Sequence, residues 1–235
     1  MAMADEALIA EVAALRRRLE VQEAIHAVRA LHFKYGYYMD RYLFDEVIAL
    51  FSRDCELHFM SGIFRGIEGA RRLYKGRLGQ FGPAPGLLID HLMMQDIVDI
   101  DADGLHASAR FRCLVQGGIH ESVADVSEQR ARLSRQYWHS GLYENRYVCE
   151  DGVWKILRFS YMTVWEAGYE EGWAHADPDR IARAQLTTLY PQDPFGPDEI
   201  APQPRGWPDT QTFPFHYVHP VTGRVWSSEP ARETL

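Results

Sequence analysis

The chain has 235 residues, a formal net charge of −8, and 46% hydrophobic and 25% charged residues. This length and composition are typical of one globular domain with a sizeable extension, and no apolar run approaches the roughly 18 residues of a membrane-spanning helix. The acidic balance argues against binding to nucleic-acid phosphates, so we predict neither a nucleic acid nor a membrane as partner. Three cysteines without a CxxC pair, and an acidic start in place of a secretory signal, predict a cytoplasmic protein with reduced thiols.

Apolar spacing predicts two helices in the first forty residues. Four apolar residues recur at spacings of four, three and four: Leu8, Val12, Leu15 and Leu19. They form one apolar face on a charged helix, so we assign residues 1–20 to an N-terminal amphipathic helix that docks on another surface. A second helical pattern follows it and ends near Asp40.

Residues 21–167 are predicted to form the main domain. A helix at 45–51, a strand at 55–60 and a helix at 66–78 precede a loop rich in glycine and proline. The apolar period then changes to two, which predicts four long strands at 87–100, 105–117, 135–149 and 153–165.

The short turns between these strands predict that they pair antiparallel in a strongly curved sheet. Strict alternation would place Leu92, Met94 and Val98 on one face and His91, Met93 and Ile97 on the other. Both faces are therefore partly apolar. We expect an α+β fold in which one face holds the helices and a pocket, while the other promotes assembly into a homo-oligomer.

The last part of the chain, residues 168–235, is predicted to be an extended arm rich in proline. It has little periodicity beyond one short helix near 178–189. It nevertheless keeps five aromatic residues: Trp207, Phe213, Phe215, Tyr217 and Trp226. Because disordered tails are usually poor in aromatics, we expect the arm to pack on the body or on a neighbouring subunit.

The common cofactor and nucleophile motifs are missing from the sequence, so we predict no cofactor and no metal. What remains is a set of polar and aromatic residues at the predicted ends of helices and strands: Tyr35, Tyr38, Asp40, His58, His91, Tyr137, His139 and Arg158. Taken alone, Asp40 could be a helix cap and His91 a core histidine with satisfied hydrogen bonds.

Five segments carry a resemblance to a known family: Tyr35-Gly-Tyr-Tyr-Met-Asp40-Arg41, residues 51–59, Phe64-Arg-Gly-Ile-Glu-Gly69, Asp90-His91, and Asp151-Gly-Val-Trp-Lys-Ile-Leu-Arg158. In this order and spacing they resemble the SnoaL-like branch of the nuclear transport factor 2-like superfamily, which includes scytalone dehydratase, lindane dehydrochlorinase and bile acid 7-alpha-dehydratase. The resemblance covers roughly residues 20–165. It implies a cone-shaped α+β barrel, with a curved antiparallel sheet wrapped by N-terminal helices around one cavity. It also implies a homotrimer, with a dimer as the next expectation.

The resemblance further implies an acid–base pair, because enzymes of this branch pair a strand histidine with an aspartate at a helix end. His91 and Asp40 occupy these positions, and Tyr35 matches a tyrosine five residues before the aspartate. A second histidine known from scytalone dehydratase has no clear counterpart, since Cys113 falls near its place. Chemically, a carboxylate that accepts from one imidazole nitrogen fixes the tautomer and leaves the other nitrogen as a base.

The expected substrate is a small, flat, hydroxylated aromatic or polycyclic molecule, because the predicted lining is mainly aromatic. We expect six residues to bind it: Tyr38, His58, Met93, Tyr137, Trp138 and Arg158. Whether Arg158 faces the cavity depends on a single residue of register. Tyr35 or Arg158 is predicted to lie near the leaving oxygen.

The length and the aromatic arm resemble the diarylpropane lyases of sphingomonads. That resemblance implies a cofactor-free lyase that converts a lignin-derived 1,2-diarylpropane-1,3-diol to a stilbene and releases formaldehyde. A dehydratase acting on a steroid or polyketide alcohol is the alternative enzyme. A non-catalytic ligand-binding or scaffolding domain is the alternative of another class.

Overall fold

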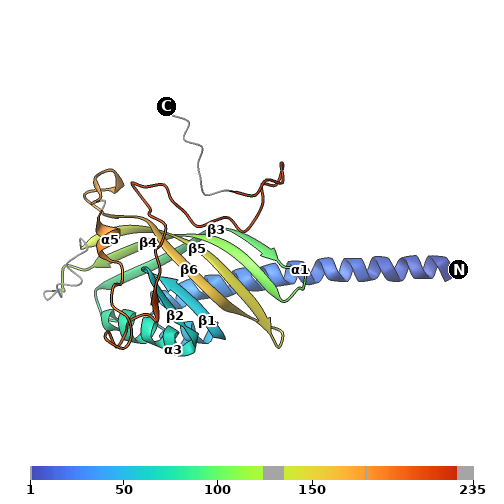
Figure 1. Ribbon diagram of the computed structural model, residues 1–235, viewed down its shortest axis with the longest axis horizontal. Helices are drawn as coiled ribbons and strands as arrows, with labels where there is room; N and C mark the ends of the chain where they lie inside the picture. Colours follow the sequence, from blue (N-terminus) through green and yellow to red (C-terminus); the bar gives the residue numbers. More distant parts are fainter. Residues whose placement is uncertain (1, 124–134, 178, 227–235) are drawn as a thin grey trace.

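The computed structural model describes residues 2–123, 135–177 and 179–226. One long helix, α1 (Ala2–Asp40), comes first and contains both helical patterns without a break. Its C-terminal half packs on the sheet, while its N-terminal half projects beyond the body (Figure 1). Helix α1 therefore has two different environments along its length.

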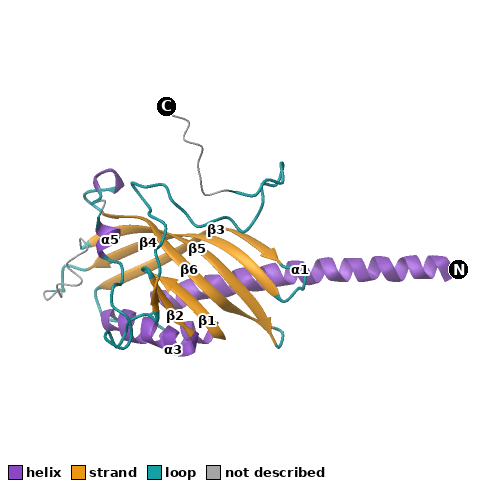
Figure 2. Cartoon of the chain, in the orientation of Figure 1, coloured by secondary structure: helices purple, strands orange, loops and turns teal. Residues whose placement is uncertain are grey.

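Short helical segments follow α1 and cover one end of the sheet (Figure 2). They are α2 (Phe44–Ala49) and α3 (Gly66–Arg71), and α3 continues as a π-helical turn, η1 (Arg72–Arg77), and a 3-10 turn, η2 (Leu78–Phe81). The two predicted helices are thus present. No helix among the described residues is both long and apolar enough to cross a bilayer.

The described strands form a curved seven-stranded sheet in the order β3-β4-β5-β6-β1-β2-β7. Their bounds are β1 (Phe51–Phe59), β2 (Gly62–Arg65), β3 (Leu87–Ile100), β4 (His106–Ile119), β5 (Gln136–Glu150), β6 (Val153–Gly168) and β7 (Glu199–Ile200). The four long strands pair antiparallel, whereas β1 runs parallel to β6. The predicted α+β cone, a long helix against a curved sheet, is confirmed.

Buried aromatic side chains fill the space between α1, the short helices and the inner face of the sheet. The fully buried ones include Tyr74, Tyr143, Tyr147, Phe111 and Phe159. His32 of α1 lies among them, with its ring 3.8 Å from that of Phe111. Burial lowers the pKa of His32 to about 3, so this histidine is neutral in the folded protein.

The predicted register fails at one point on β3. Met93 pairs with Cys113, but the next pair joins Asp96 to Phe111, so β3 carries one extra residue there. This bulge reverses the alternation. As a result Val98 is buried on the inner face and Ile97 is 41% exposed, so their predicted placement was wrong.

The described part of the arm runs back along its own body (Figure 1). It contains a 3-10 turn, η3 (Trp173–His175), a four-residue helix, α5 (Arg180–Arg183), and β7, which extends the sheet next to β2. The predicted helix at 178–189 is therefore much shorter. Further along, the Arg110 guanidinium donates to the carbonyls of Phe213 (2.8 Å) and Pro214 (3.0 Å).

Candidate active site

Asp40 and His91 meet where the C-terminal end of α1 lies against β3. His91 Nδ1 is 2.7 Å from Asp40 Oδ1, and the backbone N–H of His91 donates to the same oxygen at 2.9 Å. Both side chains are largely buried, with 10% and 12% exposure. Because the carboxylate accepts from Nδ1, the proton of the neutral imidazole stays on that nitrogen. Nε2 of His91 has no hydrogen-bond partner among the described residues, so it is free to accept a proton.

A glycine brings the helix close enough for this contact. A β-carbon placed on Gly36, one turn before Asp40, would lie 3.0 Å from the terminal carbon of Met93. Met93 stands two residues after His91 on the same face of β3. The missing side chain at position 36 therefore lets α1 approach β3, and Asp40 can then reach the imidazole and the backbone of His91.

Tyr35, the third residue of the predicted catalytic set, lies deep in the aromatic core. It is 4% exposed, accepts a hydrogen bond from the Tyr74 hydroxyl at 3.3 Å, and contacts the rings of Tyr143 and Phe159. Burial raises the pKa of Tyr35, so its phenol stays protonated. The neighbouring Cys113 is also buried, and burial raises the pKa of its thiol to about 12.

A second polar cluster lies on the inner face of the same sheet. His91 pairs with Val115, Val115 with His139, and His139 with Glu166, so the four residues form one row across β3, β4, β5 and β6. Two strand spacings separate the backbones of the two histidines, which is about 10 Å. The sheet thus presents two imidazoles on one face.

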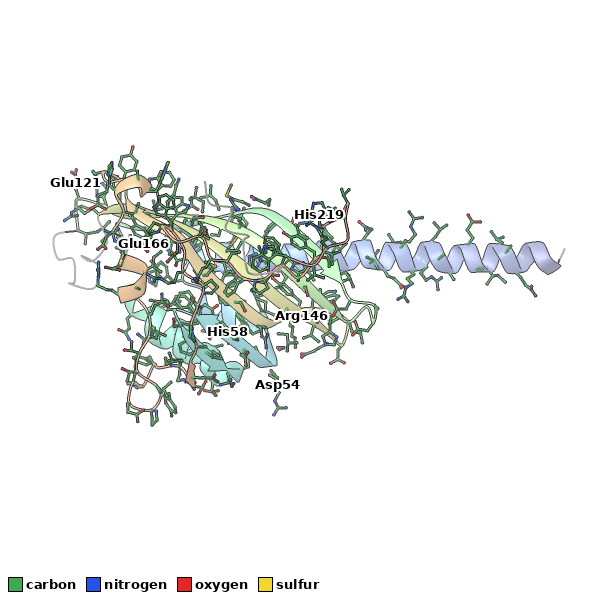
Figure 3. All side chains as sticks on the ribbon, turned by 45° about the horizontal axis from the view of Figure 1, so that its top comes forward. Asp54, His58, Glu121, Arg146, Glu166 and His219 are labelled. Carbon is green, nitrogen blue, oxygen red and sulfur yellow. The ribbon has the colours of Figure 1, made fainter. Side chains whose placement is uncertain are left out.

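His139 is held by three side chains of β6. Its Nε2 lies 2.5 Å from the Tyr161 hydroxyl and 3.2 Å from Thr163 Oγ1, and its Nδ1 lies 3.4 Å from Glu166 Oε2 (Glu166 is labelled in Figure 3). Burial raises the pKa of Tyr161 well above its usual value. Tyr161 is therefore a neutral hydroxyl in contact with an imidazole whose other nitrogen lies near the Glu166 carboxylate.

Sequence reasoning included His139 among the polar residues but gave it no role, and it missed Tyr161 and Glu166. The alternation of Tyr161 and Thr163 along β6 was the available signal. That signal was not sufficient, because β6 carries a bulge at this point: Ser140 pairs with Trp165, but the next residue, Gly141, pairs with Thr163. This extra residue decides which β6 side chains share the face of His139.

Two predicted substrate-binding residues lie away from the acid–base pair. Leu57 and Phe159 are buried on the inner face, so their neighbours His58 and Arg158 face outward. There His58 Nε2 lies 2.5 Å from a Glu56 carboxylate oxygen, and the Arg158 guanidinium lies 3.4 Å from the same atom. The structure does not bring these two residues together with Asp40 and His91.

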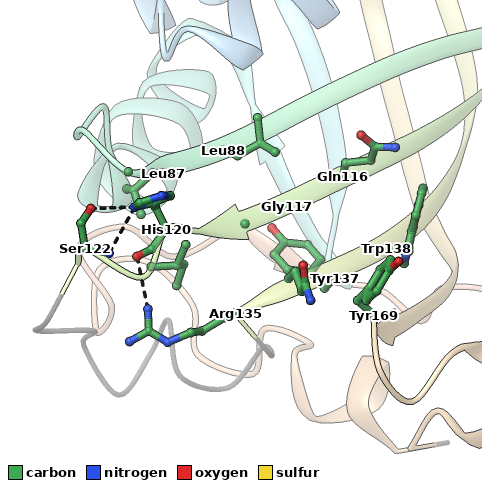
Figure 4. A pocket seen from close by; sticks show the side chains of 14 residues that line it. Leu87, Leu88, Gln116, Gly117, His120, Ser122, Arg135, Tyr137, Trp138 and Tyr169 are labelled. Carbon is green, nitrogen blue, oxygen red and sulfur yellow. Dashed lines mark hydrogen bonds between the residues drawn. The ribbon is translucent and has the colours of Figure 1, made fainter.

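Tyr137 and Trp138 border an open groove of about 670 Å³ at the ends of β3, β4 and β5 (Figure 4). Tyr137 lies over Gly117 on the inner face, and burial together with the Glu166 charge raises its pKa to about 12. Trp138 is on the other face, stacked on Tyr169. The residues around this groove do not include Asp40 or His91. The groove is therefore adjacent to the row of histidines and separate from it.

Of the two remaining predicted residues, Met93 borders the pair, while Tyr38 packs against the hydrophobic core. Met93 is half-buried beside Gly36, and Tyr38 is half-buried on the last turn of α1, two residues before Asp40. Within the described ranges, no three His, Cys, Asp or Glu side chains are arranged to hold a metal ion.

A curved sheet packed on a long helix, with a carboxylate–imidazole pair between them, places the protein among the cone-shaped α+β proteins of the nuclear transport factor 2-like fold. Within this class the chain belongs to the SnoaL-like domain family, which matches residues 20–160. No curated protein matches the chain.

Several solved structures are similar to it in fold. The hexachlorocyclohexane dehydrochlorinase LinA is 16% identical, with a TM-score of 0.53 over 68% of this chain and 98% of that one. LinA-type3 from Novosphingobium barchaimii is 16% identical, with a TM-score of 0.51 over 64% and 92%. A candidate scytalone dehydratase from Novosphingobium aromaticivorans is 21% identical, with a TM-score of 0.48 over 61% and 86%.

Proposed function

We propose that this protein is a cofactor-independent lyase in which His91 is the general base and Asp40 orients it. The observation that carries the proposal is the double contact of Asp40 Oδ1 with the ring and the backbone of His91, at 2.7 and 2.9 Å. This contact fixes the tautomer, aims Nε2 away from the carboxylate, and stabilises the imidazolium once it has taken a proton. A binding or scaffolding domain has no need of such an arrangement.

An elimination also needs an acid for the leaving hydroxyl, and we assign that role to the Tyr161–His139 pair. The pair shares the inner face with His91, and Glu166 lies on the far side of the imidazole. In this role the Tyr161–His139 pair replaces Tyr35 and Arg158, the two residues that the sequence analysis placed near the leaving oxygen. The Tyr35 hydroxyl is held by Tyr74 in the core, and Arg158 points to the outer face beside Glu56.

The proposed substrate is a lignin-derived 1,2-diarylpropane-1,3-diol with a para-hydroxyl group on one ring. With the para-hydroxyl ionised to a phenolate, the acid protonates the benzylic hydroxyl, which leaves as water as the phenolate electrons form a quinone methide. His91 then takes the proton of the terminal hydroxyl. The bond between the terminal carbon and the middle carbon of the propane chain breaks, formaldehyde leaves, and the electron pair of this bond returns to the ring. The products are a stilbene, water and formaldehyde, so the substrate itself supplies the electron demand.

Two further observations support this class of chemistry. The solved structures of similar fold include dehydrochlorinases, which are named for an elimination from a ring compound. Met93 borders the acid–base pair, so a thioether group is available to contact a flat substrate.

The test is a product assay with the purified protein, after extensive dialysis against a chelator. A diarylpropanediol should yield one formaldehyde per stilbene, measured by chromatography and by a formaldehyde-specific dye, and His91→Ala should abolish both products. A product that keeps all its carbons would identify a dehydratase instead. Unchanged substrate, across a panel that also includes hydroxylated steroids and polyketide alcohols, would contradict the assignment as a lyase.

A further inference from the structure

The N-terminal half of α1 carries an exposed apolar seam. Leu8, Val12, Leu15 and Leu19 are 59%, 49%, 52% and 58% exposed, although they follow one another along a single face of the helix. Every described side chain from residue 5 to residue 20 is exposed. A row of four large apolar residues left in water on one helix face marks an interaction surface.

The seam faces away from the protein's own body. Leu19 and Val28 are nine residues apart, which is two and a half helical turns, so they lie on opposite sides of α1. Val28 is fully buried against the body. Arg17 confirms this orientation, because its guanidinium donates to the Ala102 carbonyl of the β3–β4 turn at 2.9 Å, and position 17 lies opposite the seam.

The spacing of four, three and four is the heptad pattern of a coiled coil. In that pattern Leu8 and Leu15 occupy d positions, Val12 and Leu19 occupy a positions, and Arg17 is at f, the position furthest from the seam. Val12 at a, with Leu8 and Leu15 at d, matches the pattern that favours two parallel strands, while the second a residue, Leu19, is not β-branched. We propose that the seam is the docking site for the same helix of a second copy of this chain, in a parallel two-stranded coiled coil.

Charges beside the seam fit this partner. In a parallel pair, each g residue faces the e residue five positions later on the other helix. Glu11 at g would face Arg16 of the partner subunit, and Arg18 at the next g position would face Glu23 of the partner subunit. By symmetry each contact forms twice, so all four flanking pairs are of opposite charge.

The body does not obstruct this arrangement. The β3–β4 turn contacts α1 on the f side, so the two bodies would lie on the outer sides of the helix pair. The inference favours a dimer, the second expectation from the family resemblance, over the homotrimer that was the first, and it does not depend on the proposed reaction. The seam ends at Gln22 and His26, the next d and a positions, where polar side chains replace apolar ones.

The first test compares two glutamate substitutions on the same helix. Leu15→Glu places a charge in the seam, whereas Ala10→Glu places the same charge at an f position, on the side of Arg17. Light scattering at micromolar concentration should give Leu15→Glu half the mass of the wild type and leave Ala10→Glu unchanged, with equal circular dichroism. An unchanged mass for Leu15→Glu, or a wild-type protein that is already monomeric, would overturn the proposal. A threefold loss of mass would overturn the two-stranded arrangement.

The second test determines the direction of the helices. Glu11→Arg should weaken the dimer at least tenfold, because it faces Arg16 of the partner subunit with a like charge. The double variant Glu11→Arg/Arg16→Glu should restore it in a parallel pair. In an antiparallel pair Glu11 faces Arg18 of the partner subunit instead, so the double variant would add like charges and remain weak. Failure of the double variant to recover would therefore refute the parallel arrangement.

Discussion

Replacing Asp40 with asparagine should slow the proposed reaction about 5- to 30-fold, whereas replacing it with alanine should slow it at least about 100-fold. Both contacts to His91 end on one oxygen, Oδ1, at 2.7 and 2.9 Å. An asparagine carbonyl can accept both hydrogen bonds in the same geometry. Asp40→Asn therefore removes the negative charge and keeps the orientation of the imidazole.

The magnitude follows from the difference between charged and neutral hydrogen bonds. A hydrogen bond to a charged group contributes roughly 1.5–3 kcal/mol and a neutral one about 1 kcal/mol, so the imidazolium loses about 1–2 kcal/mol of stabilisation. Only the ring contact changes in charge during proton transfer, so this loss appears in kcat. Asp40→Ala also leaves the ring without orientation and the His91 backbone N–H without a partner, and it therefore loses most of the benefit of a positioned base.

The assay is the initial rate of stilbene formation at saturating substrate, with circular dichroism to confirm that the variants are folded. Asp54→Asn is the matched control, because Asp54 is an exposed carboxylate on β1 and should retain the wild-type rate. Equal rates for Asp40→Asn and Asp40→Ala would show that orientation through Oδ1 contributes nothing. Near-normal rates for both would show that His91 is not the base.

Two further predictions concern other histidines. His139→Phe should lower kcat about 100-fold for the diol, but much less for an analogue whose benzylic leaving group departs without a proton; equal losses on both substrates would point to a purely structural role. His32, whose pKa is lowered to about 3 by burial, takes up a proton near pH 6.5 once unfolded. The folded state should therefore lose stability as the pH falls below 6.5, by about 2–3 kcal/mol between pH 7 and 4.5. Urea unfolding should show this loss in the wild type and a much smaller one in His32→Phe, and identical losses would argue against a neutral buried histidine.

The four long strands could be predicted from sequence because each has a period-two pattern and short turns join two of the pairs. The predicted 153–165 strand, for example, corresponds to β6 at Val153–Gly168. The parallel pairing of β1 with β6 could not be predicted in this way. It joins segments about a hundred residues apart, and no turn between them specifies direction or register.

Bulges account for the remaining differences on the sheet. One extra residue on β3 moved Val98 to the inner face. A second extra residue lies on β6, because Arg146 pairs with Arg158 while the next residue of β5, Tyr147, pairs with Ile156. Each bulge reverses the faces beyond it, and a sequence pattern does not show where the extra residue falls. The outward position of Arg158 is a direct consequence.

The acid–base pair and the second cluster differed in how much the sequence revealed. Asp40 and His91 were chosen through the family resemblance, since an aspartate at a helix end and a histidine on a strand are common in proteins without any activity. The Tyr161–His139 contact depends instead on a residue without a side chain. A β-carbon on Gly141 would lie 2.2 Å from the Tyr161 hydroxyl, so only glycine there lets the phenol cross β5 and reach the imidazole. A glycine inside a strand is usually interpreted as a weak point. Here it creates the space in which the Tyr161 hydroxyl contacts the His139 ring.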